Sequence, residues 1–78
     1  MAGRKTLDGI RLARIEKVCL RAGAEARAGS NHRIVLSYPG LKNCPLATST
    51  HARRMVAPWY AKIKKCTPRE AYRALASG

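Results

Sequence analysis

Apolar residues near the start of the chain recur at helical spacing. When successive residues are turned by 100°, one stripe collects Leu12, Ile15, Val18, Cys19 and Ala22, while Arg14, Lys17 and Arg21 group away from it. Thr6 or Asp8 can cap this helix, and Gly23 follows its last turn, where glycine adopts a positive φ without strain. The pattern predicts an amphipathic helix that ends at about Ala22.

Two extended segments follow, at residues 24–28 and 31–38, around the turn residues Gly29-Ser30. Two such segments around a short glycine-containing turn are typical of a hairpin. Alternation along the second segment places Arg33, Val35 and Ser37 on one side and, on the other, His32, Ile34, Leu36 and Tyr38. A third strand at about residues 42–48 can complete an antiparallel meander, although Pro45 places it at an edge or ends it early.

The last part of the chain contains one clear helix start. Thr67-Pro68-Arg69-Glu70 has a threonine cap, a proline at the first helical position and a glutamate three residues after the cap, which together form a capping box. The final helix is predicted from Pro68 to about Ser77, with Ala71, Tyr72 and Leu75 on its apolar side.

Residues 49–66 are harder to assign. Apolar residues recur there at helical spacing, but Pro58 interrupts them and predicts a break or kink; they are Met55, Val56, Trp59, Tyr60 and Ile63. The element order predicts a single α+β domain over residues 1–78. It has two layers: a three-stranded antiparallel sheet and, on one face, the N- and C-terminal helices, with residues 49–66 as an irregular or helical insert.

The net charge of the chain narrows the classes of molecule that it can bind. Sixteen Lys and Arg stand against four Asp and Glu, giving a net charge of +12 on 78 residues. Residues 26–69 contain no acid, because the four acids are Asp8, Glu16, Glu25 and Glu70. Such a field attracts polyanions, of which RNA and DNA are favoured over anionic lipid. A surface that only keeps the protein in solution is the simpler interpretation, but such surfaces usually mix both signs.

Other classes of protein fit the sequence poorly. The chain is too short for a pair of nucleotide-binding βαβ units, and we expect no cofactor. No apolar run reaches the length of a signal peptide or a membrane span, so we expect a cytoplasmic protein. Three cysteines without close spacing argue against structural disulfides, and together with the two histidines they lack the spacing of a zinc site, so no metal is expected.

Gly29-Ser30-Asn31-His32 delivers a histidine at the start of a predicted strand. The run from Ile15 to Pro39 around this motif resembles the HicA family of toxin ribonucleases, and residues 68–75 are similar to that family's last helix. Unlike the family pattern, about a dozen extra residues follow Cys44-Pro45. They add a helix, enlarge the RNA surface, or mark a divergent relative with another use.

The resemblance implies a fold like that of double-stranded-RNA-binding domains, metal-independent cleavage of mRNA, and inhibition by a cognate HicB-like antitoxin. It implies that His32 is the catalytic residue. Attack on the phosphate by the RNA's own 2′-hydroxyl needs a base, an acid and cations, and an imidazole can perform either proton transfer. His51 is a candidate for the second transfer.

Candidate contacts to RNA surround this motif and extend into the insert. The candidate phosphate contacts are Arg27, Arg33, Lys62, Lys64 and Lys65. Ser30 and Asn31 either touch the RNA backbone or only form the turn. Trp59 and Tyr60 either stack on bases or belong to the core or a partner-binding patch.

A second hypothesis involves no catalysis. A small α+β module similar to a double-stranded-RNA-binding domain, or to the arm-binding domains of phage integrases, would bind RNA or DNA through its Arg and Lys residues. His32 would then be dispensable. A ribosomal-type protein bound to RNA is a further possibility.

Overall fold

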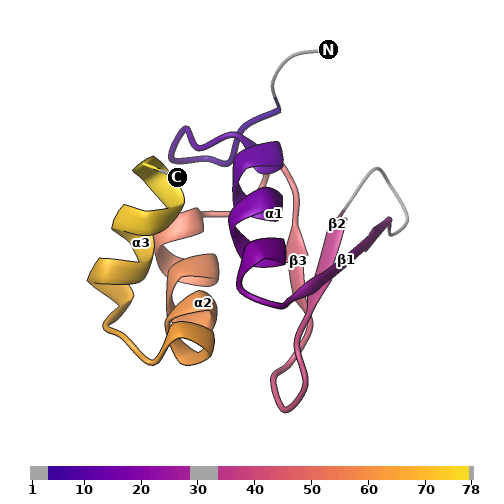
Figure 1. Cartoon of the computed structure of the whole chain (residues 1–78). Helices are drawn as coiled ribbons and strands as arrows, with labels where there is room; N and C mark the ends of the chain where they lie inside the picture. The colour runs from indigo at the N-terminus through magenta and orange to yellow at the C-terminus, as the bar shows by residue number, and fades with distance from the viewer. Residues whose placement is uncertain (1–3, 29–33, 78) are drawn as a thin grey trace.

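The structure is a computed structural model that describes residues 4–28 and 34–77. Within these ranges the chain forms a three-stranded sheet and three α-helices, one of them preceded by a π-helical turn (Figure 1). The elements are α1 (Leu12–Arg21), β1 (Glu25–Ala28), β2 (Ile34–Ser37), β3 (Cys44–Leu46), η2 (Ala52–Val56), α2 (Ala57–Lys64) and α3 (Pro68–Ser77). The α+β class and the order of the strands are as predicted, with one helix more than the two that were assigned.

The first helix buries the predicted stripe. Leu12, Ile15, Val18 and Cys19 are buried and Ala22 is half-buried, while Gly23 closes the helix with a φ of 100°. The predicted cap was wrong. The helix begins only at Leu12, its N-cap residue Arg11 makes no side-chain cap, and neither Thr6 nor Asp8 reaches its first turn.

The chain before α1 forms a hydrogen-bonded turn and not the first turn of the helix. The Thr6 amide donates to the Ile10 carbonyl at 2.8 Å, and Lys5 bridges Arg11 in antiparallel fashion. Gly9 has a φ of 87°, which lies outside the helical region. This turn holds the helix back to Leu12 and leaves the Asp8 carboxylate available to another element.

The sheet is an antiparallel meander in the order β1-β2-β3. Ala26 pairs with Leu36, and Leu36 pairs with Cys44, so these residues lie on one face. On the opposite face, Arg27 pairs with Val35, and Val35 pairs with Pro45. Leu36, Cys44 and Leu46 are buried, whereas Arg27 and Pro45 are exposed, so the first face carries the core. β3 is an edge strand, as one of the two alternatives for Pro45 predicted, and it is shorter than the expected residues 42–48.

The insert forms η2 and α2. The Ala57 amide bonds the Ala52 carbonyl, five residues back, and Pro58 then occupies the first turn of α2, where its missing N–H leaves no bond unmade. The break expected at Pro58 is therefore a change of helix type. Trp59 and Tyr60 are buried, and the Trp59 indole Nε1 donates to the Lys42 carbonyl at 2.6 Å. They belong to the core and do not form a stacking surface.

The last helix begins at the predicted capping box. Thr67 Oγ1 accepts the Glu70 amide at 3.1 Å, and Glu70 Oε1 accepts the Thr67 amide at 3.0 Å. α3 packs chiefly against α2 and also contacts α1 and η2. The three helices lie on one side of the sheet, with α1 between the strands and the α2–α3 pair in the view of Figure 1. The opposite face of the sheet carries no helix within the described residues.

Candidate nucleic-acid interface

Basic side chains dominate the described surface. Fifteen of the sixteen Lys and Arg lie within residues 4–28 and 34–77, and all fifteen are exposed. The remaining one is Arg33, outside the described residues. The acid-free part of the chain thus supplies exposed positive charge from β1 and α2, where the sequence predicted contacts to phosphate, and also from the start of α3, where it predicted none.

The predicted catalytic motif, which includes Ser30, Asn31 and His32, lies outside the described residues. The structure describes the two strands that this segment joins. Ala28, the last residue of β1, pairs with Ile34, the first residue of β2. The chain therefore enters and leaves the motif through paired strand ends, in the order that the sequence predicted.

The remaining predicted contacts fall into two groups. Arg27 is exposed on the face of β1 that carries no helix, whereas Lys62 and Lys64 are exposed in the last turn of α2. Lys65 ends that helix in the left-handed conformation, with a φ of 54°. α1 lies between β1 and α2 in Figure 1, so Arg27 and these lysines do not meet in one site. Lysines in a last turn also interact favourably with the helix dipole, which explains their position without RNA.

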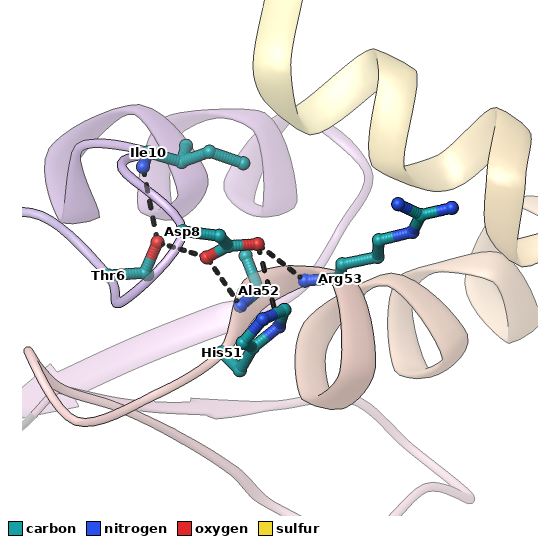
Figure 2. A network of polar contacts seen from close by, with 6 residues as sticks. All are labelled: Thr6, Asp8, Ile10, His51, Ala52 and Arg53. Carbon is teal, nitrogen blue, oxygen red and sulfur yellow. Dashed lines mark hydrogen bonds and ion pairs between the residues drawn. The ribbon is translucent and has the colours of Figure 1, made fainter.

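A polar network joins the N-terminal turn to the start of η2 (Figure 2). Asp8 Oδ1 accepts the Thr6 hydroxyl at 2.6 Å and the Ala52 amide at 2.9 Å, while Oδ2 accepts the Arg53 amide at 3.0 Å. Asp8 therefore caps a helix that begins 44 residues later in the chain, by satisfying two amides of its first turn. The Leu7 amide strengthens the same junction by donating to the Thr50 carbonyl at 2.9 Å.

The network keeps Asp8 ionised. Desolvation alone raises the pKa of this carboxyl, but the hydrogen bonds from Thr6, Ala52 and Arg53 outweigh it and lower the pKa from 3.8 to about 2. A carboxylate at the start of a helix is further favoured by the helix dipole.

His51 lies beside this carboxylate. Its Nδ1 is 3.7 Å from Asp8 Oδ2, a distance that suits an ion pair with a protonated imidazole but is too long for a hydrogen bond. Nδ1 is buried and has no hydrogen-bond partner within the described residues, although 37% of the side chain is exposed. The structure thus pairs His51 with an acid, at a junction whose other contacts hold the fold together.

Two of the three thiols, those of Cys19 and Cys44, are buried. Burial raises the pKa of Cys19 to about 12 and that of Cys44 to about 11, so both stay protonated in the core. Among residues 4–28 and 34–77, no three His, Cys, Asp or Glu side chains gather in a way that could hold a metal ion. In the same part of the chain, no helix is long and apolar enough to cross a membrane.

Two features of this region were not predicted from the sequence. The Asp8 cap joins segments far apart in the chain, and a lone aspartate gives no sign of a remote partner. Tyr72 of α3, assigned only to an apolar side, lies under the Arg53 guanidinium, whose carbon is 5.8 Å from the ring centroid. In Figure 2 the Arg53 side chain points away from Asp8 towards α3.

Comparison with known proteins adds no relative: no protein-family model, no curated protein and no solved structure matches the chain.

Proposed function

We propose that the protein is a HicA-like endoribonuclease that cleaves mRNA without a metal, with His32 as its catalytic residue. The observation that carries the proposal is the order of elements around the motif. A helix closed by Gly23 leads into β1, and β1 and β2 pair up to the two ends of the segment that contains Gly29-Ser30-Asn31-His32. This order, together with the basic surface, is what the resemblance to the HicA family requires.

The chemistry needs little from the protein. The 2′-hydroxyl of the RNA attacks the adjacent phosphorus and loses its proton to a base, while the bond from phosphorus to the 5′-oxygen breaks and that oxygen takes a proton from an acid. His32 performs one of these two transfers. Arg27 and Arg33, which flank the motif in sequence, stabilise the charge that builds on the phosphate, with Ser30 and Asn31 touching the backbone.

The biological setting follows from this activity. An enzyme that cuts mRNA in the cytoplasm is toxic, so we propose that it is one half of a toxin–antitoxin pair. A HicB-like antitoxin would cover His32 and the neighbouring basic side chains. The same proposal includes a fold like that of double-stranded-RNA-binding domains. In this protein η2 and α2 would be additions to that fold.

A direct test uses purified protein, a long RNA and EDTA. The wild type should produce fragments, and His32→Ala should produce none while keeping the thermal unfolding midpoint of the wild type. His51→Gln removes the only other imidazole of the sequence and tests whether that residue makes the second transfer. Fragments from His32→Ala, or their loss only with His51→Gln, would overturn the assignment of His32.

A nucleic-acid-binding module without catalysis is the second candidate. It is favoured by the exposure of all fifteen described Lys and Arg, which are spread over the helices, the loops and β1 instead of being gathered around one segment. Such a module, similar to a double-stranded-RNA-binding or integrase-arm-binding domain, would bind RNA or DNA and yield no fragments in EDTA. Its affinity would be the same with His32→Ala as with the wild type.

A further inference from the structure

Two hollows meet at Tyr72 on the helical side of the molecule. The first, of about 580 Å³, lies between α3 and the chain around the start of α1, and its lining includes Lys5, Arg11 and Arg14. The second, of about 320 Å³, is lined by Arg53, Pro68 and Arg69. Tyr72 lines both hollows, and we call the two hollows together the Tyr72 groove.

The Tyr72 groove is strongly positive. Five exposed cations line it: Lys5, Arg11, Arg14, Arg53 and Arg69. Its one acid is Asp8, whose two oxygens already accept hydrogen bonds from Thr6, Ala52 and Arg53. Cations along a groove concentrate and hold the phosphates of a nucleic-acid backbone.

The cations differ in how far they are already engaged. Arg14 donates from Nη1 to the Ala76 carbonyl at 2.7 Å and so fastens α1 to the end of α3. The Arg53 guanidinium lies over the Tyr72 ring. The side chains of Lys5, Arg11 and Arg69 make no hydrogen bond or ion pair within the described residues. These three remain available to phosphates at both ends of the groove.

The aromatic ring favours a single strand over a duplex. Tyr72 is half-buried, so its ring is held in place while part of it faces the two hollows. An aromatic ring within a basic groove is the usual arrangement in proteins that bind single strands, since unstacked bases lie on the ring while the backbone follows the cations. In a duplex the bases are already stacked on one another, and the ring would contribute nothing.

We infer that the Tyr72 groove binds single-stranded RNA, with phosphates on Lys5, Arg11 and Arg69 and one base against the Tyr72–Arg53 pair. The inference rests on the RNA-binding half of the proposed function and does not depend on His32. In Figure 1, α1 lies between α3 and the β1–β2 pair. The groove therefore holds a part of the strand other than the part at the segment that joins β1 and β2.

Fluorescence anisotropy with a labelled 12-nucleotide 2′-O-methyl-uridine RNA tests this surface, because that RNA lacks the hydroxyl needed for cleavage. Arg11→Gln combined with Arg69→Gln should weaken binding at least about 5-fold. It should also lower the slope of log affinity against log salt by about 1.4, since each phosphate contact to a single strand contributes about 0.7. The matched control is Lys17→Gln with Lys42→Gln, which removes the same charge at exposed positions that do not line the groove. It should weaken binding less than about 2-fold.

The ring is tested separately. Tyr72→Leu should weaken binding at least about 5-fold, the lower end of the effect of removing a stacking ring, whereas Tyr72→Phe keeps the ring and should bind like the wild type. If Tyr72→Leu fails to fold by circular dichroism, the Arg11 and Arg69 variant still decides the inference, because both side chains are exposed.

The possible results separate the two proposals. Equal binding by the groove variant and its control would overturn the groove while leaving cleavage by His32 untouched. A 12-base-pair RNA duplex bound as tightly as the single strand, with no effect of Tyr72→Leu, would overturn the assignment to single strands. A protein that binds through the groove but yields no His32-dependent fragments would overturn only the ribonuclease.

Discussion

Asp8→Asn should destabilise the fold by breaking the junction between the N-terminal turn and η2. The asparagine oxygen can keep the contacts that Asp8 Oδ1 makes with Thr6 and Ala52. Its NH2 group, however, is a donor and would face the Arg53 N–H, which is also a donor, so the bond to Arg53 is lost. One helix amide loses its partner, and the negative charge at the helix start disappears.

The size of the effect follows from the pKa of Asp8. A fall from 3.8 to about 2 corresponds to about 2.4 kcal/mol of stabilisation of the ionised form, at 1.36 kcal/mol per pH unit. Solvent screening at the molecular surface reduces this figure, and loss of an N-cap typically costs about 0.5–2 kcal/mol. We expect Asp8→Asn to lower the free energy of unfolding by about 1–2 kcal/mol. In a domain of this size that corresponds to a fall in Tm of about 5–15 °C.

The pH dependence of this loss of stability tests whether the Asp8 carboxylate causes it. Because folding lowers the pKa of Asp8, its contribution to stability is complete above about pH 5 and is lost as the pH falls through about 2. Urea unfolding followed by the fluorescence of Trp59, the only tryptophan, should show the full difference between wild type and Asp8→Asn at neutral pH. The difference should shrink as the pH approaches 2.

Glu16→Gln is the matched control for the loss of one negative charge from a protein of net charge +12. Glu16 lies on α1, and its side chain makes no hydrogen bond or ion pair within the described residues. It should change stability by less than about 0.5 kcal/mol. Equal losses for the two variants, or a loss for Asp8→Asn that persists unchanged at pH 2, would refute the role given to the carboxylate.

Three further changes test local features by urea unfolding. Gly23→Ala should cost about 1–2 kcal/mol because of its φ of 100°; the added Cβ would lie 3.6 Å from a Tyr38 ring carbon, an ordinary contact, so full stability would show that the backbone differs. Thr67→Ala should cost about 1 kcal/mol by removing the acceptor for the Glu70 amide, and Thr67→Ser should restore most of it. Trp59→Phe should cost at least about 1 kcal/mol, since it leaves the Lys42 carbonyl without its indole donor; an unchanged midpoint would show that this bond does not stabilise the fold.

The sequence predicted those parts of the fold that depend on near neighbours. The stripe of α1 and the capping box of α3 each involve residues within a few positions of one another, so their pattern is visible in the chain itself. The alternation of β2 was also readable, because one face of the sheet is buried and the other carries no helix.

The sequence failed where distant segments meet. α2 shows no clear amphipathic stripe, because buried residues occur around most of its short length: Ala57, Trp59, Tyr60 and Ala61. Pro58 added to the difficulty, since a proline in a first turn starts a helix while one further along breaks it. The Asp8 cap and the Tyr72 groove depend on contacts between the N-terminal turn and elements at least 44 residues later in the chain, which no local pattern encodes. The predicted motif at His32 lies outside the described residues and rests on sequence alone.

The ends of the RNA fragments give the most direct test of the central claim. This claim is that the 2′-hydroxyl of the RNA attacks the adjacent phosphate while His32 transfers a proton. Mass spectrometry of a defined RNA incubated with the wild type in EDTA should show fragments with 2′,3′-cyclic phosphate and 5′-hydroxyl ends, and His32→Ala should leave the RNA intact. Fragments with 3′-hydroxyl and 5′-phosphate ends, or the same cyclic-phosphate products from His32→Ala, would contradict the account.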